Sequence, residues 1–344
     1  MSADAICASP PRSAKRSKAY YAAALSLLVM LTLTSVFIGS RDIPFDVTIQ
    51  SLVSFDQHNT QHLLVHYLRV PRTLLALVVG AALAGAGVIM QAMTRNPLAD
   101  PGILGVNAGA MVMVVVGIAW LGLSDIVHYL WLGLLGAALS AAAVYLLAGM
   151  GDKPNPVRVV LAGSAITVVL LSLTHLITIN SHQEVFNQFR HWAVGSLQGR
   201  GYDVLLPVSI LVAIGLMAAV MLAGALDTVV LGSEMGKALG ANPIWVWFAA
   251  SGVVTLLAGS ATAAAGPISF LGLTAPHLAR FVMGAEHRRL LPFAMLLGAT
   301  LMLGADIAGR IIGYPGEISV GIMIALLGGP CFVVLVRRWK LSQL

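Results

Sequence analysis

The chain has 344 residues, of which 58% are hydrophobic and only 10% are charged, and its mean hydropathy is +0.89. Soluble domains carry about 25% charged residues, so this composition excludes a soluble globular protein. The net charge of +6 fits the excess of Lys and Arg on the inner side of membrane proteins. Because the sequence shows no compact basic face, we expect no nucleic-acid partner.

The first segments predict a retained membrane span behind a basic cytoplasmic tail, residues 1–18. Residues 20–39 give about 20 apolar positions, too long for a signal-peptide core, and no small-residue cleavage pattern follows. Residues 40–67 are predicted as a polar loop. Nine further spans are predicted near 68–93, 103–122, 127–149, 157–180, 204–224, 244–263, 268–284, 290–312 and 318–337. The fold prediction is therefore an all-α integral membrane protein with about ten spans in one domain, residues 1–344.

Three histidines in the predicted loop, His58, His62 and His66, recur every four residues and would line one face of a helix. Such spacing can hold zinc or copper, but only Asp56 accompanies them. A chance occurrence on a polar surface is the favoured interpretation, so no metal site is predicted and their role stays open.

The segment Arg95-Asn96-Pro97-Leu98-Ala99-Asp100-Pro101-Gly102 interrupts two apolar stretches. Its unpaired backbone groups cannot face lipid, so it must be buried in protein or line an aqueous path. Pro97 and Pro101 end the preceding helix near Arg95, and Asp100 can cap the next one. Leu98 is the large apolar side chain in this turn and is predicted to plug a gate, with simple packing as the alternative. The predicted gate residues are Asn96, Pro97, Leu98 and Asp100.

A second Gly/Pro-rich interruption, residues 265–277, follows another Gly/Ala-rich span. Two interrupted segments in corresponding halves indicate an inverted repeat whose interface forms a pathway.

Ten spans place both termini on one side, and basic residues decide which side. The side with the termini carries thirteen basic residues and the other side six. The thirteen are Arg12, Lys15, Arg16, Lys18, Arg95, Lys153, Arg158, Lys237, Arg288, Arg289, Arg337, Arg338 and Lys340; the six are Arg41, Arg69, Arg72, Arg190, Arg200 and Arg310. Both termini are therefore predicted to be cytoplasmic.

The longest predicted cytoplasmic segment, residues 226–242, mixes charged and apolar side chains. Its Gly232–Ala238 stretch has three residues between the glycines and lacks the Ser or Thr of a phosphate loop, so we expect ATP to be bound by another chain. Two short helices broken at Gly232 and Gly240 would present an apolar ridge to a soluble partner, although a simple connector is an equal alternative. The residues of this ridge and its rim are Leu231, Glu234, Met235, Lys237, Ala238, Leu239 and Gly240.

Three arginines at the opposite side, Arg69, Arg72 and Arg310, could capture carboxylates on an incoming partner. Snorkelling at helix ends is the alternative for each one. Asp306 lies four residues before Arg310, so we expect this pair to meet across one helical turn. With no second buried acid, the pair does not predict a proton relay.

Ten motifs occur in a fixed order along nearly the whole chain, at residues 68–72, 85–91, 95–102, 104–109, 190–197, 238–240, 266–273, 276–277, 305–310 and 328–330. Together they resemble the permease family of ABC importers for ferric siderophores, haem and cobalamin. Within that family, the segments at 96–102 and 190–197 are most similar to ferric-siderophore permeases.

The resemblance implies a type II importer in the bacterial inner membrane, without covalent chemistry or a cofactor in this chain. It implies a second permease subunit, identical or paralogous, two ATPase subunits that bind ATP and magnesium, and an extracytoplasmic substrate-binding protein. It also implies that Arg69, Arg72 and Arg310 meet acids on that protein, that 96–98 lies at the cytoplasmic gate, and that 227–242 forms coupling helices. An ion-coupled transporter and a structural membrane anchor are the alternatives; the first would need paired buried acids, and the second would not need the interruption at 95–102.

Overall fold

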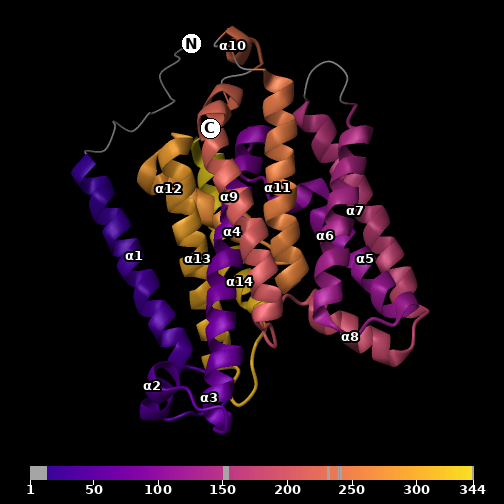
Figure 1. The fold of residues 1–344 in the computed structure, drawn as a ribbon. Helices are drawn as coiled ribbons and strands as arrows, with labels where there is room; N and C mark the ends of the chain where they lie inside the picture. The colour runs from indigo at the N-terminus through magenta and orange to yellow at the C-terminus, as the bar shows by residue number, and fades with distance from the viewer. Residues whose placement is uncertain (1–13, 150–154, 231–232, 239, 241, 343–344) are drawn as a thin grey trace.

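The computed structural model describes residues 14–149, 155–230, 233–238, 240 and 242–342. The secondary structure of this part of the chain is helical (Figure 1). The helices are α1 Ala14–Phe37, α2 Phe45–Val53, α3 Thr60–Leu64, the π-helix η1 Val65–Arg69, α4 Val70–Thr94, the 3-10 helix η2 Pro101–Leu104, α5 Val106–Leu121, α6 Ile126–Leu147, α7 Pro156–Ile179, α8 Gln183–Ala193, α9 Tyr202–Val230, α10 Ser233–Ala238, α11 Pro243–Ala265, α12 Leu271–Met283, α13 His287–Ile312 and α14 Val320–Ser342.

Each of the ten predicted spans corresponds to one of these helices, α1, α4 to α7, α9 and α11 to α14. Within the described residues, seven helical stretches are long and apolar enough to cross a membrane, and α5 and part of α14 are shorter apolar helices. The 13 residues of α12 rise about 20 Å, less than the roughly 30 Å of a hydrocarbon core. The span predicted at 268–284 is therefore a half-length helix behind an irregular segment.

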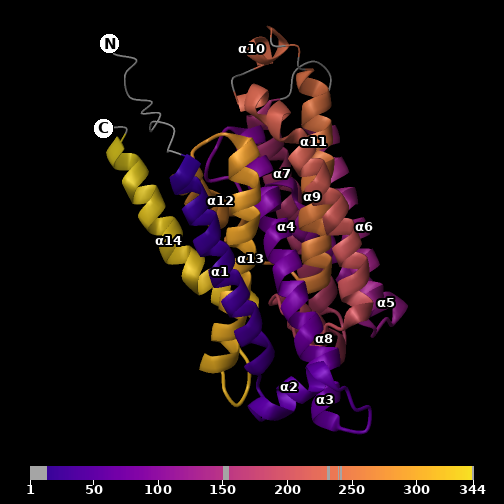
Figure 2. The same cartoon turned by 60° about the vertical axis from the view of Figure 1, so that its left-hand side comes forward.

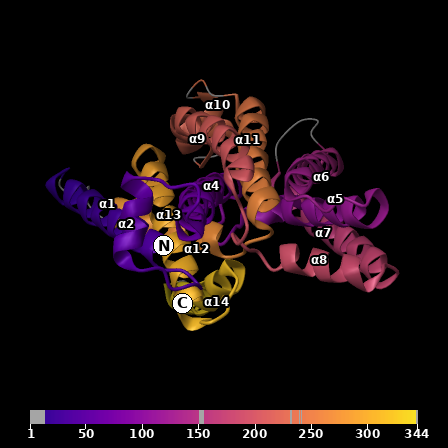
Figure 3. The same cartoon turned by 60° about the horizontal axis from the view of Figure 1, so that its bottom comes forward.

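The helix bundle has two distinct ends. The beginning of α1, the end of α14 and α10 lie at one end, which we call the α10 end, and α2, α3 and α8 lie at the other, the α3 end (Figures 1 and 2). The view from the α3 end shows α4 surrounded by other helices (Figure 3). Most of the 25 residues of α4 are buried, since α9, α11, α12 and α13 all pack on it.

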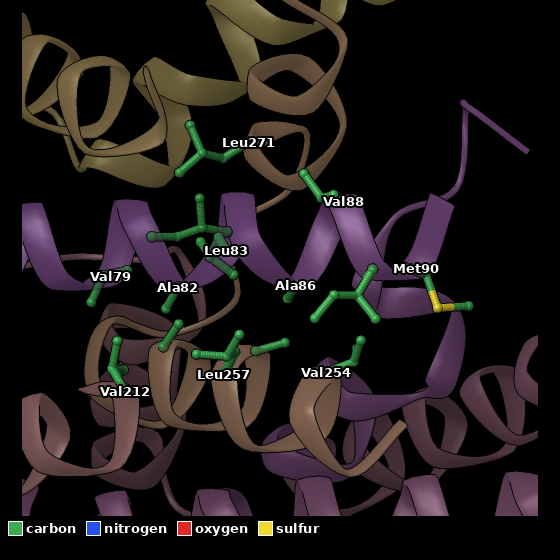
Figure 4. Close-up of a cluster of buried hydrophobic side chains, with 14 of the residues drawn as sticks. Val79, Ala82, Leu83, Ala86, Val88, Met90, Val212, Val254, Leu257 and Leu271 are labelled. Atoms are coloured by element: carbon green, nitrogen blue, oxygen red, sulfur yellow. The ribbon is translucent and has the colours of Figure 1, made fainter. Parts of the chain in front are cut away.

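Small residues allow this close packing around α4. A Cβ on Gly87 would lie 1.9 Å from the carbonyl oxygen of Gly272, and one on Gly80 would lie 2.5 Å from that of Gly298. On the same stretch of α4, Val79, Ala82, Leu83 and Ala86 face apolar side chains of α9, α11 and α12 (Figure 4). Close backbone packing of this kind is the usual means of helix association in lipid, because burial of apolar surface there contributes little to association.

The two interruptions predicted from the sequence lie at opposite ends of the antiparallel helices α4 and α11. Arg95 follows α4 and contacts Val229 near α10, whereas Ala265 ends α11 and accepts a hydrogen bond from Ser196 N, just after α8. An inverted repeat requires this arrangement.

The prediction of a polar loop at 40–67 is wrong, because this segment contains α2, α3 and part of η1. Phe45, Ile49, Leu52 and Val53 recur at helical spacing and stay exposed, while Thr48 is buried. The helix was missed because its nine residues are too few for a membrane span. The amphipathic helix α8 was also not predicted.

Candidate functional sites

The first candidate site is an ionic cluster at the α3 end. Asp306 of α13 accepts hydrogen bonds from Arg310 Nη2 at 2.6 Å, as the four-residue spacing predicts, and from Arg72 Nη2 at 2.7 Å. Arg72 also donates from Nη1 to Glu317 Oε2 at 2.6 Å. Sequence reasoning missed both the Arg72–Asp306 pair and Glu317, because these residues lie far apart in the chain and no local pattern joins them. Asp306 was expected to have no second buried acid beside it, but Arg72 joins it to Glu317, which is partly buried.

Two of the arginines also hold the end of α1. Arg69 Nη1 donates to the carbonyls of Val36 and Phe37 at 3.2 and 2.8 Å. Arg310 Nη1 donates to the carbonyls of Ser35 and Ile38 at 2.8 and 2.6 Å. The last carbonyls of a helix have no partner within the helix and carry partial negative charge, so cations are favoured there.

Arg69, Arg72 and Arg310 do not lie on an open surface, since they are 8%, 9% and 1% exposed. All three nevertheless line a cavity of about 150 Å³, together with exposed Arg41 and partly buried Glu317. Among the described residues, Arg69 donates to backbone carbonyls and to no carboxylate. Four arginines stand against the three carboxylates of Asp306, Glu317 and nearby Asp42, which leaves the pocket with excess positive charge.

Glu317 remains ionised in this pocket. Burial alone would raise the pKa of its carboxyl, but the charge and hydrogen bond of Arg72, with smaller contributions from Ser40 and Arg310, bring the pKa below its ordinary value. The carboxylate therefore offsets part of the arginine charge at neutral pH.

The second candidate site is the predicted gate, which lies at the α10 end. The helix α4 ends at Thr94, and Arg95 adopts the left-handed conformation with φ 50°. Asn96 Oδ1 accepts from Leu98 N at 3.0 Å, and Asp100 Oδ1 accepts from Gly102 N at 2.8 Å. The predicted helix end at Arg95 and the Asp100 cap are confirmed, although the chain first forms the 3-10 turn η2 before α5. Pro97 and Leu98 are partly buried, and the proposed plugging role of Leu98 stays a prediction.

The third candidate site is the predicted coupling segment, whose described part contains one short helix, α10, where two were predicted. Met235 is 58% exposed, and Ala238 and Gly240 are also exposed. Leu231 and Leu239 lie outside the described residues. Glu234 and Lys237 belong to α10, but their side chains are not described.

Asp227, predicted to open this segment, belongs instead to the last turns of α9, which continues to Val230. Its Oδ1 lies 2.6 Å from His287 Nδ1 and accepts from His287 N at 3.2 Å, so it fixes the start of α13. The first proline after Leu222 is Pro243, so no proline ends α9 at the predicted boundary near 224. Two residues beyond Asp227, the carbonyl of Val229 accepts from Arg95 Nε at 3.2 Å. The end of α9 thus contacts the gate segment and leads directly to α10.

The histidines near the α3 end do not form a common face, because α3 begins only at Thr60 and changes to a π-helix at Val65. His62 Nδ1 accepts from Asp56 N at 3.1 Å, and the His66 ring packs 4.8 Å from that of Phe55. In the part of the chain that the structure describes, no three His, Cys, Asp or Glu side chains are grouped to hold a metal ion.

Comparison with known proteins covers nearly the whole chain. The model of the FecCD transport family matches residues 27–338. A siderophore transport system permease protein of Bacillus subtilis is 40% identical over 314 residues, 91% of this chain and 93% of that protein. The ferric enterobactin transport system permease protein of Escherichia coli is 41% identical over 315 residues, again 91% of this chain and 93% of that protein. A solved inward-facing conformation of a metal-chelate type ABC transporter matches with a TM-score of 0.81 at 29% identity, over 93% of this chain and 99% of that one.

Proposed function

This chain belongs to the FecCD transport family and is a permease subunit of a bacterial ABC importer, and we propose that it moves a ferric siderophore across the cell membrane. The cargo assignment rests on two permeases that match nearly the whole chain, at 40% and 41% sequence identity, and that are named for siderophore and ferric-enterobactin transport. Haem and cobalamin, which the family resemblance also suggests, are the alternative cargoes.

An importer permease works with ATPase subunits and a substrate-binding protein, and we propose the arginine pocket at the α3 end as the docking point for the latter. Among the described residues, Arg69 donates hydrogen bonds to backbone carbonyls and to no carboxylate, although Asp42 and Glu317 lie near enough to interact with its charge. Arg41 is exposed at the pocket wall. A carboxylate of the binding protein that enters the pocket would meet several guanidinium groups in a partly desolvated setting. Such charge-assisted bonds are stronger than neutral ones. Because Arg72 and Arg310 are held by Asp306, they set the potential of the pocket. Arg41, which is exposed, and Arg69, which donates to backbone carbonyls, are the donors left for an incoming carboxylate.

The α10 end is proposed to face the cytoplasm, with both chain termini there. Exposed Arg95, Arg158, Arg288 and Arg289 lie at this end. At the α3 end, Arg41 and Arg190 are exposed, whereas Arg69, Arg72 and Arg310 are buried and bonded within the protein. The positive-inside rule therefore favours the α10 end as the cytoplasmic side.

Two ATPase subunits are proposed to dock on residues 227–242 of this chain and of a second permease subunit, identical or paralogous. Exposed Met235 and Ala238 on α10 offer an apolar contact. Ser172 and His175 on α7 are exposed within or near the hydrocarbon region. Polar groups at that depth face protein or water, so α7 is proposed to line a central path beside the second subunit.

The proposed transport step needs no covalent chemistry in this chain. ATP bound with magnesium in the partner subunits moves α10, the last turn of α9 follows, and the Arg95–Val229 contact carries this motion to residues 96–100. Alternate opening at the two ends then follows as a two-state rearrangement.

The cargo is tested with the complete importer, reconstituted in vesicles with its ATPase and binding protein. Uptake of a ferric catecholate, a ferric hydroxamate, hemin and cobalamin is measured with and without ATP. We expect ATP-dependent uptake of one or both ferric siderophores and none of the others. Uptake restricted to hemin or cobalamin would reassign the cargo, and uptake driven by an ion gradient without the ATPase would contradict the importer mechanism.

A further inference from the structure

An apolar groove runs between α6 and α11, two helices that lie side by side (Figure 1). It consists of two cavities of about 260 and 370 Å³ that share Tyr145 and Phe248 as walls. The first cavity opens at the α10 end, at Ile244 and Trp245, and the second continues to Leu256. From Ile244 to Leu256 the groove follows α11 for about 18 Å.

The walls of the groove suit a hydrocarbon chain. Its deeper part is lined by small residues, among them Ala138, Ala141 and Gly252, and a Cβ on Gly252 would find no atom within 4 Å. Trp245 and Phe248 are 67% and 59% exposed at its rim. A hollow on a membrane-spanning surface that stayed empty would forfeit dispersion contacts along both helices, so lipid is the natural occupant.

The amide and charged side chains at this groove lie at its α10 end, whereas its deeper part carries the hydroxyls of Ser251, which donates to the Trp247 carbonyl, and Thr255. Gly149 and Asn155 line the first cavity, and Arg158 Nη1 lies 3.8 Å from where a side chain on Gly149 would begin. Arg158 is exposed. Trp245 lies in the first turn of α11 and is an amphipathic aromatic residue of the kind that is enriched where a membrane helix meets lipid head groups. A cation at the mouth of an apolar groove is the arrangement that complements an anionic phospholipid.

We propose that an anionic phospholipid occupies this groove, with one acyl chain between α6 and α11 and its phosphate at Arg158. The Tyr145 hydroxyl in the wall is buried and has no hydrogen-bond partner among the described residues, so it can serve a lipid oxygen after a small side-chain movement. The groove begins at the first turn of α11, five positions after α10 ends. The lipid therefore braces the membrane side of the segment on which the ATPase is proposed to dock.

The test uses the complete importer purified in mild detergent, with bound phospholipid counted by native mass spectrometry after titration with phosphatidylglycerol or phosphatidylcholine. A Cβ at position 252 meets no atom within 4 Å, so Gly252→Leu extends a side chain into the groove, and Gly252→Ala is its small counterpart. Ala213→Leu, which adds the same side chain at an exposed site on α9, is the matched control. Arg158→Gln removes the charge at the mouth.

We expect wild type, Gly252→Ala and Ala213→Leu to retain one phosphatidylglycerol per permease subunit, and Gly252→Leu to lose it while the complex stays assembled. Arg158→Gln should reduce the preference for phosphatidylglycerol over phosphatidylcholine about fivefold, the effect of one basic residue at a lipid surface. Phosphatidylglycerol with brominated chains should quench Trp245 fluorescence, measured against Trp245→Phe, in wild type and not in Gly252→Leu. Equal retention by Gly252→Leu and wild type, or equal affinity of wild type for the two lipids, would overturn the proposal.

Discussion

Arg95, which ends α4, donates a hydrogen bond from Nε to the backbone carbonyl of Val229, which lies at the end of α9, at 3.2 Å. This contact joins the proposed gate to the helix that leads into α10. Arg95 holds a left-handed backbone conformation that costs free energy for most residues, so the contact also fixes the direction in which the chain leaves α4.

Replacing Arg95 with Asn should weaken coupling between ATP hydrolysis and transport. Asn tolerates the left-handed conformation, so Arg95→Asn removes the guanidinium with little backbone strain. We expect transport per ATP hydrolysed to fall about tenfold, the equivalent of ~1.4 kcal/mol for a charged hydrogen bond. The ratio is measured in vesicles containing the complete importer.

Arg289→Asn is the matched control for that experiment, because it removes a charge at the same end from an exposed pair with Glu286. It should leave the ratio unchanged. An unchanged ratio in Arg95→Asn as well would remove the Arg95–Val229 contact from the coupling path.

Replacing Asp306 with Asn should destabilise the permease strongly. Both Asp306 and Arg310 are 1% exposed, and the substitution leaves two buried guanidinium groups without their shared carboxylate. Breaking a buried ion pair from one side costs about 3–5 kcal/mol. Thermal unfolding in detergent measures the loss. A melting temperature equal to that of wild type would mean that water or lipid compensates the charge.

Replacing Arg41 with Glu should weaken docking of the binding protein without disturbing the buried cluster. Arg41 is exposed and lines the pocket, so its reversal changes the potential that an incoming carboxylate meets. We expect about a tenfold loss of association at low ionic strength and a smaller loss at high salt, since exposed charges are screened. Surface plasmon resonance with the permease in nanodiscs measures this.

Arg190→Glu, on α8 at the same end but outside the pocket, is the matched control and should have little effect. Reversing the charges of Arg69, Arg72 and Arg310 together would not test docking alone, because it would also break the hydrogen bonds of Arg72 and Arg310 to Asp306. If Arg41→Glu and Arg190→Glu weaken association equally, general surface charge and not the pocket guides docking.

Replacing Glu317 with Gln should lower stability at neutral pH and not in strong acid. The folded-state pKa of Glu317 lies below its ordinary value of 4.5, so its ionised form contributes stability above that value. This contribution is lost as the pH falls through the lowered folded-state pKa. Thermal melts of wild type and Glu317→Gln should therefore converge on acidification. If the difference in melting temperature between the two proteins stayed constant down to strong acid, the loss of stability would come from packing and not from the charge of Glu317.

The sequence predicted the ten helices of the membrane domain well, because long apolar stretches and Gly/Pro breaks are local signals. The helix end at Arg95 and the Asp100 cap followed from proline chemistry in the same way. The Arg72–Asp306 pair and the Arg95–Val229 contact could not be predicted, since packing alone brings these distant residues together. The helix α2 escaped prediction because its nine residues are too few for a membrane span.

The most direct test of an ATP-driven gate at 96–100 is the reactivity of a cysteine at Leu98. Leu98→Cys is made with Cys7 and Cys331 replaced by Ser and assembled into the complete importer. Labelling by a membrane-impermeant maleimide added at the ATPase side, and cross-linking to the second permease subunit, are followed in nucleotide-free, ATP-bound and ADP-bound states. We predict that cross-linking and protection occur together in the closed state and that both disappear when the ATPase cycle opens the path. A thiol that stays unreactive and never cross-links in any nucleotide state would contradict a gate at Leu98.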